Sequence, residues 1–330
     1  MTAKMKRREF ITLLGGAMAA WPRAARAQQP ALPVIGYLSA LSESQIPNLI
    51  EALRRGLSEN GFVEGTSVII NYRFAEGEYG RLQTFATEFV RRPVSLIVAV
   101  GPPAAFAAKV VTTSIPIVFS VGLDPVAAGL VTSFNHPGGN ATGVSLITGP
   151  LGQKRLELLR ELAPKASTIA MLINPVSPDA VPEIRDVEQA AQANGLGLKI
   201  LNASTPAEIE RAFAEIAESK PDALLVGSDP FYVLHRKQIT SLVAPLRIPA
   251  IYPFREFVAA GGLLSYGASL VGAQRQVGIY AGRILRGAKV ADLPVLQPTT
   301  FELVLNLKTA SAQGIEVPPM LHARTDEVIE

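Results

Sequence analysis

Residues 222–252 have the sequence DALLVGSDPFYVLHRKQITSLVAPLRIPAIY, in which two short apolar runs flank a segment of helical length. The first run, residues 223–226, stops at the turn residues Gly227 to Pro230. The second run covers residues 248–252, and the segment between them predicts a helix over residues 231–246. This order predicts strand, helix and strand. Because a tight hairpin does not join parallel neighbours, the connecting helix makes the two strands parallel.

The same pattern occurs in the first half of the chain. An apolar run at residues 96–100 leads into Gly101, Pro102 and Pro103, a helix follows from Ala104, and residues 115–119 form the next strand. Outside these two units, apolar strand-like runs alternate with helix-like segments. We expect further strands at 34–38, 68–74, 142–146, 169–173, 198–202, 263–267 and 301–307, and further helices at 48–60, 81–91, 151–162, 183–194 and 271–285. Alternation of this kind predicts an α/β protein with two doubly wound parallel sheets.

Composition limits the class of protein. The chain has 330 residues, of which 48% are hydrophobic and 18% are charged, so it is long enough for two globular domains. It contains no cysteine. Disulfides, thiolate metal sites, a cysteine nucleophile and a lipid-modified cysteine are therefore excluded.

The first 27 residues have the features of an export signal. Lys6, Arg7 and Arg8 precede a short apolar region, and Ala25-Arg26-Ala27 fits a cleavage site. The segment from Lys6 to Ile11 resembles a twin-arginine signal, which predicts a soluble periplasmic protein without a lipid anchor. The leader carries a net charge of +5, and the whole chain carries +3, so the rest carries −2. A mature chain of this charge gives no reason to expect a nucleic-acid partner.

Ligands of open parallel sheets bind at the carboxyl ends of the strands, and the candidate binding residues are taken from there. The candidates in the first half are Ser39, Gly101, Pro102 and Asp124. The candidates in the second half are Asn174, Asp229, Phe231, Tyr252 and Tyr266. If two such sheets face each other, the Gly101 loop and the Asp229 loop form opposite walls of one cleft.

Several candidates have two interpretations. Asp124-Pro125 and Asp229-Pro230 are sequences in which the aspartate either caps a helix or pairs with an ammonium group. The backbone after Gly101 is a candidate donor to a carboxylate. Tyr252 and Tyr266 either stack on a planar ligand or belong to the core.

No catalytic or metal-binding motif stands out. His136, His235 and His322 lack metal-ligand spacing, and the chain has no nucleophile elbow, zinc-protease motif or phosphate-binding loop. We therefore expect no cofactor, no metal and no enzymatic activity. An exported α/β hydrolase that uses Ser, Asp and a distant His is the alternative, as is a sensory domain that reports to a membrane partner.

Several segments together resemble one family, the ABC-transporter substrate-binding proteins that include the tryptophan-binding TrpX-like proteins. The resemblance is carried by residues 6–11, 33–38, 115–119, 122–126, 135–145, 251–257, 265–269 and 301–309. It implies a type I periplasmic binding fold in which three crossovers form a hinge. Lobe one would hold residues 31–143 and 267–293, and lobe two residues 144–266 and 294–330.

The same resemblance implies how the protein works. A small molecule, with an amino acid or an aromatic carboxylate favoured, would bind between the lobes and be delivered to an ABC permease in the inner membrane. We expect the receptor to be a monomer.

Overall fold

A computed structural model describes residues 31–146 and 148–330. The predicted export signal, residues 1–27, lies outside these residues. The strands are β1 (Val34–Ser39), β2 (Ile69–Phe74), β3 (Leu96–Val100), β4 (Ile117–Val121), β5 (Ala141–Ser145), β6 (Thr168–Ile173), β7 (Gly197–Asn202), β8 (Ala223–Val226), β9 (Ala250–Tyr252), β10 (Leu264–Gly267), β11 (Glu302–Asn306) and β12 (Glu327–Ile329).

The α-helices account for most of the remaining regular structure. They are α2 (Pro47–Ser58), α3 (Gly80–Arg91), α4 (Pro102–Val111), α5 (Thr148–Leu162), α6 (Ala180–Ala193), α7 (Pro206–Ser219), α8 (Pro230–Leu234), α9 (Arg236–Val243), α10 (Arg255–Ala259), α11 (Leu270–Leu285), α12 (Leu307–Gln313) and α13 (Pro319–His322). Short 3-10 turns lie at η1 (Glu43–Gln45), η2 (Ala244–Leu246) and η3 (Val290–Asp292).

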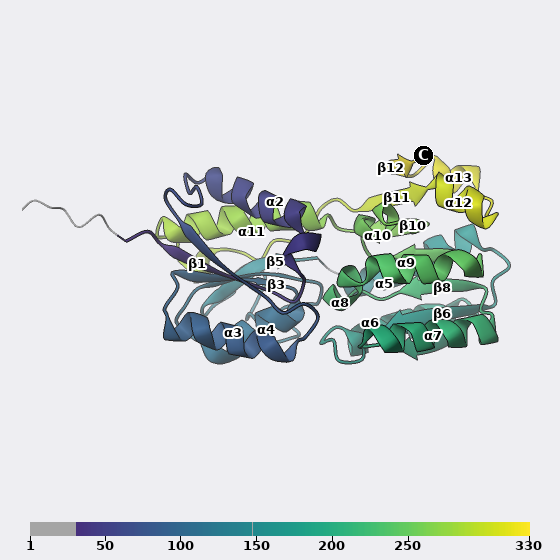
Figure 1. The fold of residues 1–330 in the computed structure, drawn as a ribbon, viewed down its shortest axis with the longest axis horizontal. Helices are drawn as coiled ribbons and strands as arrows, with labels where there is room; N and C mark the ends of the chain where they lie inside the picture. The colour runs from purple at the N-terminus through teal and green to yellow at the C-terminus, as the bar shows by residue number, and fades with distance from the viewer. Residues whose placement is uncertain (1–30, 147) are drawn as a thin grey trace, which may run out of the picture. The chain divides into compact units, whose positions relative to one another are not determined.

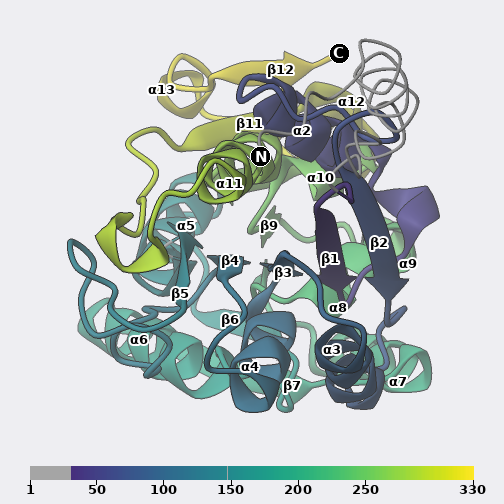
Figure 2. The ribbon, with the colours of Figure 1, turned by 90° about the vertical axis from the view of Figure 1, so that its left-hand side faces the viewer.

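The first sheet has the strand order β2-β1-β3-β4-β5, and all its pairs are parallel. Every residue of β3, β4 and β5 is buried, as expected for strands covered on both faces. Helices α2 and α11 lie on one face, and α3 and α4 lie on the other (Figures 1 and 2). The predicted doubly wound sheet is therefore confirmed in the first half.

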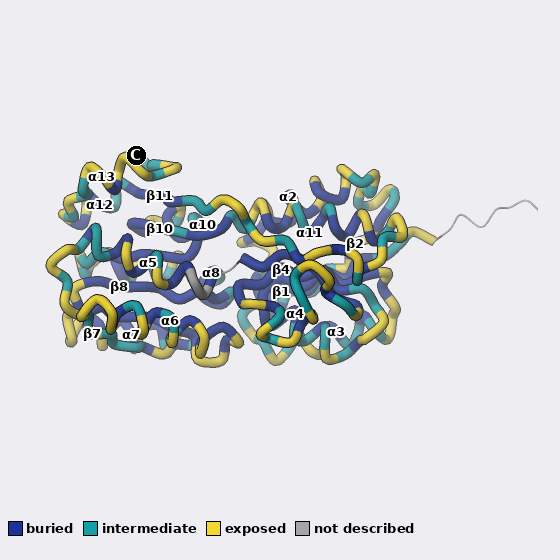
Figure 3. Tube along the Cα trace, turned by 180° about the vertical axis from the view of Figure 1, so that it is seen from behind, coloured by how far each residue is buried: buried dark blue, intermediate teal, exposed yellow. Residues whose placement is uncertain are grey.

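The second sheet has the order β12-β11-β10-β9-β8-β6-β7. Its pairs are parallel except for β10 and β11, which pair in the antiparallel sense. Side chains of β6 alternate between two apolar layers: Met171 packs with α5 and α6, whereas Leu172 packs with the layer that contains residues of α7 and α9. The central strands β8 and β9 are buried, whereas the edge strands β7 and β12 are partly exposed, and the outer faces of the helices are exposed (Figure 3). The doubly wound architecture is confirmed here too, with one antiparallel junction that the sequence did not predict.

The helix predicted over residues 231–246 is wrong as a single element. Helix α8 ends and α9 begins around His235, whose φ of −95° and ψ of 16° lie outside the helical range. His235 is the C-cap of α8 and the N-cap of α9, so the chain turns there. The predicted start of the helix at Ala104 is also wrong. Helix α4 begins two residues earlier, at Pro102, because proline lacks the N–H that the first helical turn leaves unused.

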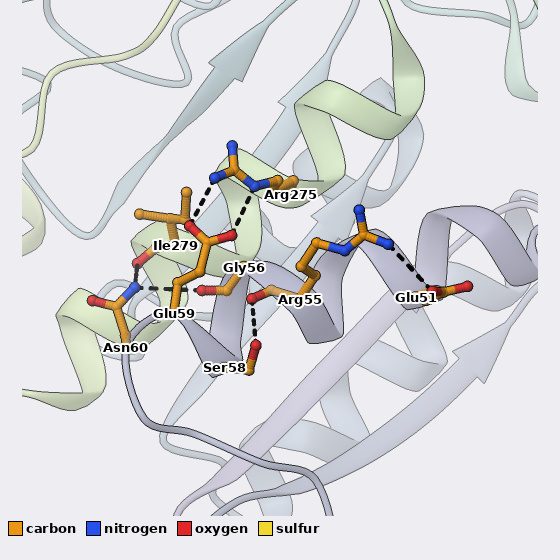
Figure 4. Close-up of polar contacts among 8 residues, drawn as sticks. All are labelled: Glu51, Arg55, Gly56, Ser58, Glu59, Asn60, Arg275 and Ile279. Carbon is orange, nitrogen blue, oxygen red and sulfur yellow. Dashed lines mark hydrogen bonds and ion pairs between the residues drawn. The ribbon is translucent and has the colours of Figure 1, made fainter.

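The C-terminal part of the chain divides between the two sheets: α11 packs against the first, and β11 and β12 belong to the second. Helix α11 packs on α2 so closely that a Cβ at Gly56 would lie 2.0 Å from the Arg275 carbonyl oxygen, and one at Gly278 would lie 2.2 Å from that of Leu53. An ion pair of 2.8 Å joins Arg275 to Glu59 beside this contact (Figure 4). The absence of side chains at both glycines thus fixes α11 against the first sheet.

The region where the chain leaves the first sheet differs from the predicted boundary at Gly143. Strand β5 continues to Ser145, and Leu296 forms a parallel bridge with Val144. The backbone N–H of Leu296 donates to the carbonyl oxygen of Gly143 over 2.9 Å. Residues 294–296, assigned by the sequence to the second half, therefore lie along the edge of the first sheet.

In the described ranges, 31–146 and 148–330, no helix is long and apolar enough to cross a membrane.

Candidate solute-binding cavity

A cavity of about 60 Å³ lies where the carboxyl ends of strands from both sheets meet. Gly101 and Gly122, which follow β3 and β4, line it from the first sheet, and Ser228 and Asp229, which follow β8, line it from the second. A Cβ at Gly101 would lie 2.8 Å from Cγ of Pro230, so the two loops are in close contact. The predicted arrangement of the Gly101 and Asp229 loops on facing walls is therefore observed.

Asp229 is the most constrained polar residue of the cavity. Its Oδ1 accepts three hydrogen bonds: from the Tyr79 hydroxyl at 2.6 Å, from Asn174 Nδ2 at 2.9 Å and from the backbone N–H of Phe231 at 2.8 Å. Its Oδ2 is buried and has no hydrogen-bond partner at ordinary distance among the described residues, although the nearby Ser177 hydroxyl helps to lower the pKa of the carboxyl. Burial raises the pKa of this carboxyl, and the hydrogen bonds from Tyr79 and Asn174 oppose that rise. One oxygen is thus held in place while the other remains unused.

Asp179 lies on the same cavity and was not predicted as a site residue. It precedes α6 at the N-cap position, but its side chain makes no capping hydrogen bond. Its Oδ1 is buried without a partner, and a Cβ at Gly122 would lie 2.9 Å from its Oδ2. Burial raises its pKa well above the ordinary value, and the charges of Glu183 and Asp229 raise it further. The Asp179 carboxylate therefore does not cap α6, and it faces Gly122 of the first sheet instead.

Gln274 is the polar residue that α11 contributes to the cavity. Its Nε2 donates to the Ser120 hydroxyl over 2.9 Å, and its Oε1 is buried without a partner. The side chain is 2% exposed. Because α11 is fixed by its glycine contacts with α2, this amide is held by the first sheet and not by the second.

A buried ion pair supports the loop after β8. Arg155 Nη2 donates to Glu183 Oε1 over 2.7 Å, and neither side chain is more than 2% exposed. Glu183 also accepts the backbone N–H of Ser228, at 2.9 Å to Oε2. Arg155 therefore balances the charge of Glu183, and the pair positions the residue before Asp229.

Three of the predicted residues line this cavity, namely Gly101, Pro102 and Asp229, and Asn174 lies behind Asp229 as a donor to it. The sequence suggested the backbone at and after Gly101 as a donor to a carboxylate, and the first three positions of this segment have no free N–H. The Gly101 N–H donates to the Ser120 carbonyl oxygen over 2.8 Å, and Pro102 and Pro103 have no N–H.

Ser39 and Asp124 lie elsewhere. The Ser39 hydroxyl is buried and accepts the backbone N–H of Leu41 over 3.1 Å, so it shapes the turn after β1. The Asp124 carboxylate is exposed and accepts the N–H groups of Val126 and Ala127 over 2.8 and 3.1 Å. Asp124 also lines a larger cavity of about 610 Å³ that shares Gly122 and Asp179 with the first.

The three predicted aromatic residues lie outside the lining of the small cavity. Tyr252 is fully buried and stacks on Phe257 with ring centres 5.1 Å apart. Phe231 packs on His235 at 4.4 Å, and Tyr266 packs on Phe301 at 6.0 Å. These contacts belong to the core and to the loops that support the site. Large aromatic side chains at strand ends are often buried against neighbouring core residues.

Sequence reasoning missed Asp179, Gln274 and Tyr79, and two of them left a signal. Asp179 ends the same loop that begins at Asn174, directly before α6. Gln274 is a polar residue on the apolar face that Ala273 and Val277 define in α11. A buried polar residue on an apolar helix face is informative because it needs a partner. For Tyr79 the local sequence offers no such signal.

Within the part of the chain that the structure describes, no three His, Cys, Asp or Glu side chains are grouped to hold a metal ion.

Comparison with known proteins gives consistent matches. A sequence profile described as "ABC transporter substrate binding protein" matches residues 35–329. A tyrosine-binding protein of Clostridioides difficile is 27% identical over 296 residues, which cover 89% of this chain and 85% of that protein.

Two solved structures extend the comparison. An ABC domain in complex with L-Trp from Streptococcus pneumonia has a TM-score of 0.81 at 27% identity, covering 89% of this chain and all of that one. The ligand-free, open structure of a substrate binding protein with adhesive properties from Clostridium difficile has a TM-score of 0.65, also at 27% identity, covering 91% of this chain and 99% of that one.

Proposed function

Because the chain belongs to the family of ABC transporter substrate binding proteins, we propose that it is a receptor for a free amino acid, which binds between the two sheets. The relatives named above include a tyrosine-binding protein and a domain solved with L-Trp, which favours an aromatic amino acid. The observation that carries the proposal is the unpartnered Oδ2 of Asp229. A buried carboxylate oxygen that faces a cavity is a ready partner for an ammonium group.

The walls of the cavity support a ligand with an apolar side chain. Apart from its few polar groups, the lining is apolar and includes Leu41, Leu49, Val233 and Phe254. A few placed polar groups on an apolar wall are typical of small-molecule sites. Entry of an amino acid into this small space requires the sheets to move apart, and closure around the ligand then buries it.

The lobes and hinge follow from how the chain crosses between the sheets. It leaves the first sheet after β5, returns between β10 and α11, and crosses again between η3 and β11. We assign these three connections as the hinge. The lobe boundaries then lie a few residues beyond those expected from the sequence, after Ser145 and after Leu296.

The proposed protein binds without turnover and presents its closed form to an ABC permease, after export by the leader to the periplasm. The hydrolase alternative required a histidine near a nucleophile. His136 is exposed in a loop, His235 packs on Phe231, and neither lines the cavity. The geometry therefore favours a receptor.

A thermal-shift screen tests the proposal. The chain without its leader is refolded to remove bound solute and then scanned with the free amino acids, aromatic acids, sugars and purines. A ligand present at about 100 times its dissociation constant stabilises the folded state by about 2.7 kcal/mol. We expect a shift of several degrees with an aromatic amino acid and none with sugars or purines. A shift with a sugar alone would contradict the assignment.

A further inference from the structure

Several contacts between the two sheets are made by the short helix α8 and the residues beside it. Figure 1 shows α8 where the two sheets meet. At its start, the Tyr79 hydroxyl donates to Oδ1 of Asp229 over 2.6 Å and accepts the backbone N–H of Phe231 over 3.2 Å. At its end, a Cβ at Gly77 would lie 3.1 Å from Cδ2 of Leu234. The helix that the cavity aspartate caps therefore touches the first half of the chain at both ends.

Arg236, just beyond this helix, forms a second set of bonds to the first half. Its Nη1 donates to Oε1 of Gln45 over 3.1 Å, and its Nη2 donates to the carbonyl oxygen of Gln45 over 3.2 Å. Nη1 also donates to the carbonyl oxygen of Val233 over 2.7 Å, which orients the guanidinium on its own side. Two donors of a planar guanidinium that meet two oxygens of one residue form a directional contact. We call the bonds between Arg236 and Gln45 the rim contact.

The rim contact lies just outside the small cavity. In the sequence, Gln45 lies between Leu41 and Leu49, and it is exposed. Arg236 is partly buried and follows Val233 by three residues. The three apolar residues line the cavity, and Gln45 and Arg236 do not belong to its lining. The rim contact therefore lies between the cavity and solvent on this side.

The contacts described here join groups of the protein, so they stabilise the closed arrangement before a ligand is present. Tyr79 and Gln45 belong to the first half of the chain, and Asp229 and Arg236 belong to the second. Separation of the sheets breaks these bonds, and a solute enters and leaves the small cavity only through the separated form. A bond that favours the closed form therefore slows both entry and release.

We propose that Arg236 is a positioning residue that holds the two sheets together through the rim contact, so that the empty protein is mainly closed and its opening limits ligand exchange. The inference goes beyond the proposed function, because it concerns a contact outside the cavity and holds for any solute that binds there. One net hydrogen bond changes an equilibrium constant about fivefold. Loss of the rim contact should raise the ratio of open to closed protein by about this factor.

The distance between the two halves of the empty protein is the first test. The chain has no cysteine, so Gln83→Cys on α3 and Ser241→Cys on α9, both at exposed positions, carry spin labels at these two places alone. Double electron–electron resonance on the refolded chain without its leader should give mainly the short distance of the closed form. Arg236→Ala should raise the population at longer distance about threefold or more. The matched control is Lys237→Ala, at the exposed neighbouring position, which should leave the distribution unchanged.

Two results of this measurement would overturn the proposal. One is a mainly long distance in the protein that keeps Arg236. The other is the same distribution in the Arg236→Ala and Lys237→Ala proteins.

The kinetics of ligand exchange are the second test, with L-tryptophan as the probe. Trp21, the single tryptophan, lies in the leader, so the fluorescence of the probe has no protein background. Arg236→Ala should raise the association and dissociation rate constants about threefold or more and leave Kd within about twofold, because the rim contact is lost from the closed form with and without ligand. Gln45→Ala removes one of the two acceptors, and it should change both rate constants in the same direction by less. A higher Kd with an unchanged association rate constant would place Arg236 in the binding site and overturn the proposal.

The two tests separate this inference from the proposed function. If neither L-tryptophan nor L-tyrosine binds the protein, the assignment as a receptor for an aromatic amino acid is overturned, and the distance measurement still decides the role of Arg236. If L-tryptophan binds and Arg236→Ala changes neither the distances nor the rate constants, the receptor assignment stands and the rim contact has no part in closure.

Discussion

The loop after β4 and the loop after β8 contain the same dipeptide, Asp-Pro, at the same distance from the end of the strand, and use it differently. Asp124 is exposed, and its Oδ1 caps the N–H groups of Val126 and Ala127. Asp229 is 2% exposed, and its Oδ1 caps only the N–H of Phe231 while it also binds Tyr79 and Asn174. The first aspartate stabilises a turn, and the second also leaves Oδ2 unused beside a cavity.

The difference comes from residues that are far away in the sequence. Tyr79 lies 150 residues before Asp229, and Asn174 lies 55 residues before it. These donors hold Oδ1, and burial removes water from Oδ2, which under the proposed function pairs with the ammonium group of the ligand. An exposed cap has water as an alternative partner. Burial and distant donors, and not the local sequence, therefore separate a binding carboxylate from a capping one.

Replacement of the two aspartates by asparagine tests this comparison. Asp229→Asn keeps the shape and a capping oxygen but removes the charge that faces the cavity. We expect the Kd for the preferred ligand to rise about 100-fold, about 2.7 kcal/mol, within the range for a buried charged hydrogen bond. Titration calorimetry measures the loss. Asp124→Asn should leave the Kd unchanged, and equal losses in both variants would show that the two loops do not differ in function.

The pH dependence of ligand affinity is a second test of whether the buried acids of the cavity, and not the exposed Asp124, pair with the ligand. Asp179 faces Glu183 and Asp229, and Asp229 faces Tyr79, Asn174 and Ser177. Burial raises the pKa of both acids above the ordinary value of about 3.9. A cationic ligand displaces a proton that the empty protein holds below the raised pKa. Affinity should therefore fall as the pH falls through that pKa, by up to about tenfold per pH unit for one proton.

The empty protein should show the opposite trend in its free energy of unfolding. An acid whose pKa is raised in the folded state contributes stability that is present below the unfolded pKa and is lost as the pH rises through the folded pKa. Chemical denaturation across this window, with and without ligand, measures both slopes. Parallel slopes would show that the ligand does not pair with these acids.

The hydrogen bond from the Tyr79 hydroxyl to Oδ1 of Asp229 joins the two sheets. Its removal tests whether the distant donors that hold Oδ1 matter for ligand binding. Tyr79→Phe deletes one of the three donors and favours separation of the sheets. We expect about a fivefold rise in Kd, about 1 kcal/mol, which is the size of a typical net hydrogen bond. Tyr72→Phe is the control, because the Tyr72 hydroxyl bonds to Glu64 within the first sheet region. A similar change in both variants would contradict a special role for Tyr79.

The capping role of Asp124 predicts a small effect on stability alone. Asp124→Ala removes the acceptor of two backbone N–H groups at the surface. We expect a loss of about 1 kcal/mol in the free energy of unfolding and about 2 °C in Tm. Calorimetric unfolding measures this, and ligand affinity should not change. A larger effect on affinity than on stability would place Asp124 in the binding site.

The architecture was predictable from the sequence because it depends on local periodicity. Apolar runs such as Leu96–Val100 and Ala223–Val226 are short, are followed by turn residues and alternate with helical segments, so strands and parallel pairing follow. The break at His235 and the antiparallel pairing of β11 were missed. Both features depend on tertiary packing: the break depends on how α8 and α9 pack against the second sheet, and the antiparallel pairing depends on how the C-terminal segment adds to that sheet.

The site was predictable only in part. Strand-end position identified Gly101 and Asp229, because parallel strands bring their carboxyl ends to one edge. It also selected Tyr252, which the finished fold buries against Phe257. Asp179 and Gln274 are identified by a buried side-chain oxygen that lacks a hydrogen-bond partner among the described residues. This property is visible only when the three-dimensional structure shows the neighbours of each buried oxygen.

A crystal structure of the complex with the preferred ligand tests the central claim most directly. We predict the ligand nitrogen at about 3 Å from Oδ2 of Asp229, the distance of an N–H···O hydrogen bond. The sheets should lie on both sides of the ligand. A ligand nitrogen bound at Asp124, or a ligand confined to the larger cavity with Asp229 Oδ2 still unpaired, would contradict the claim.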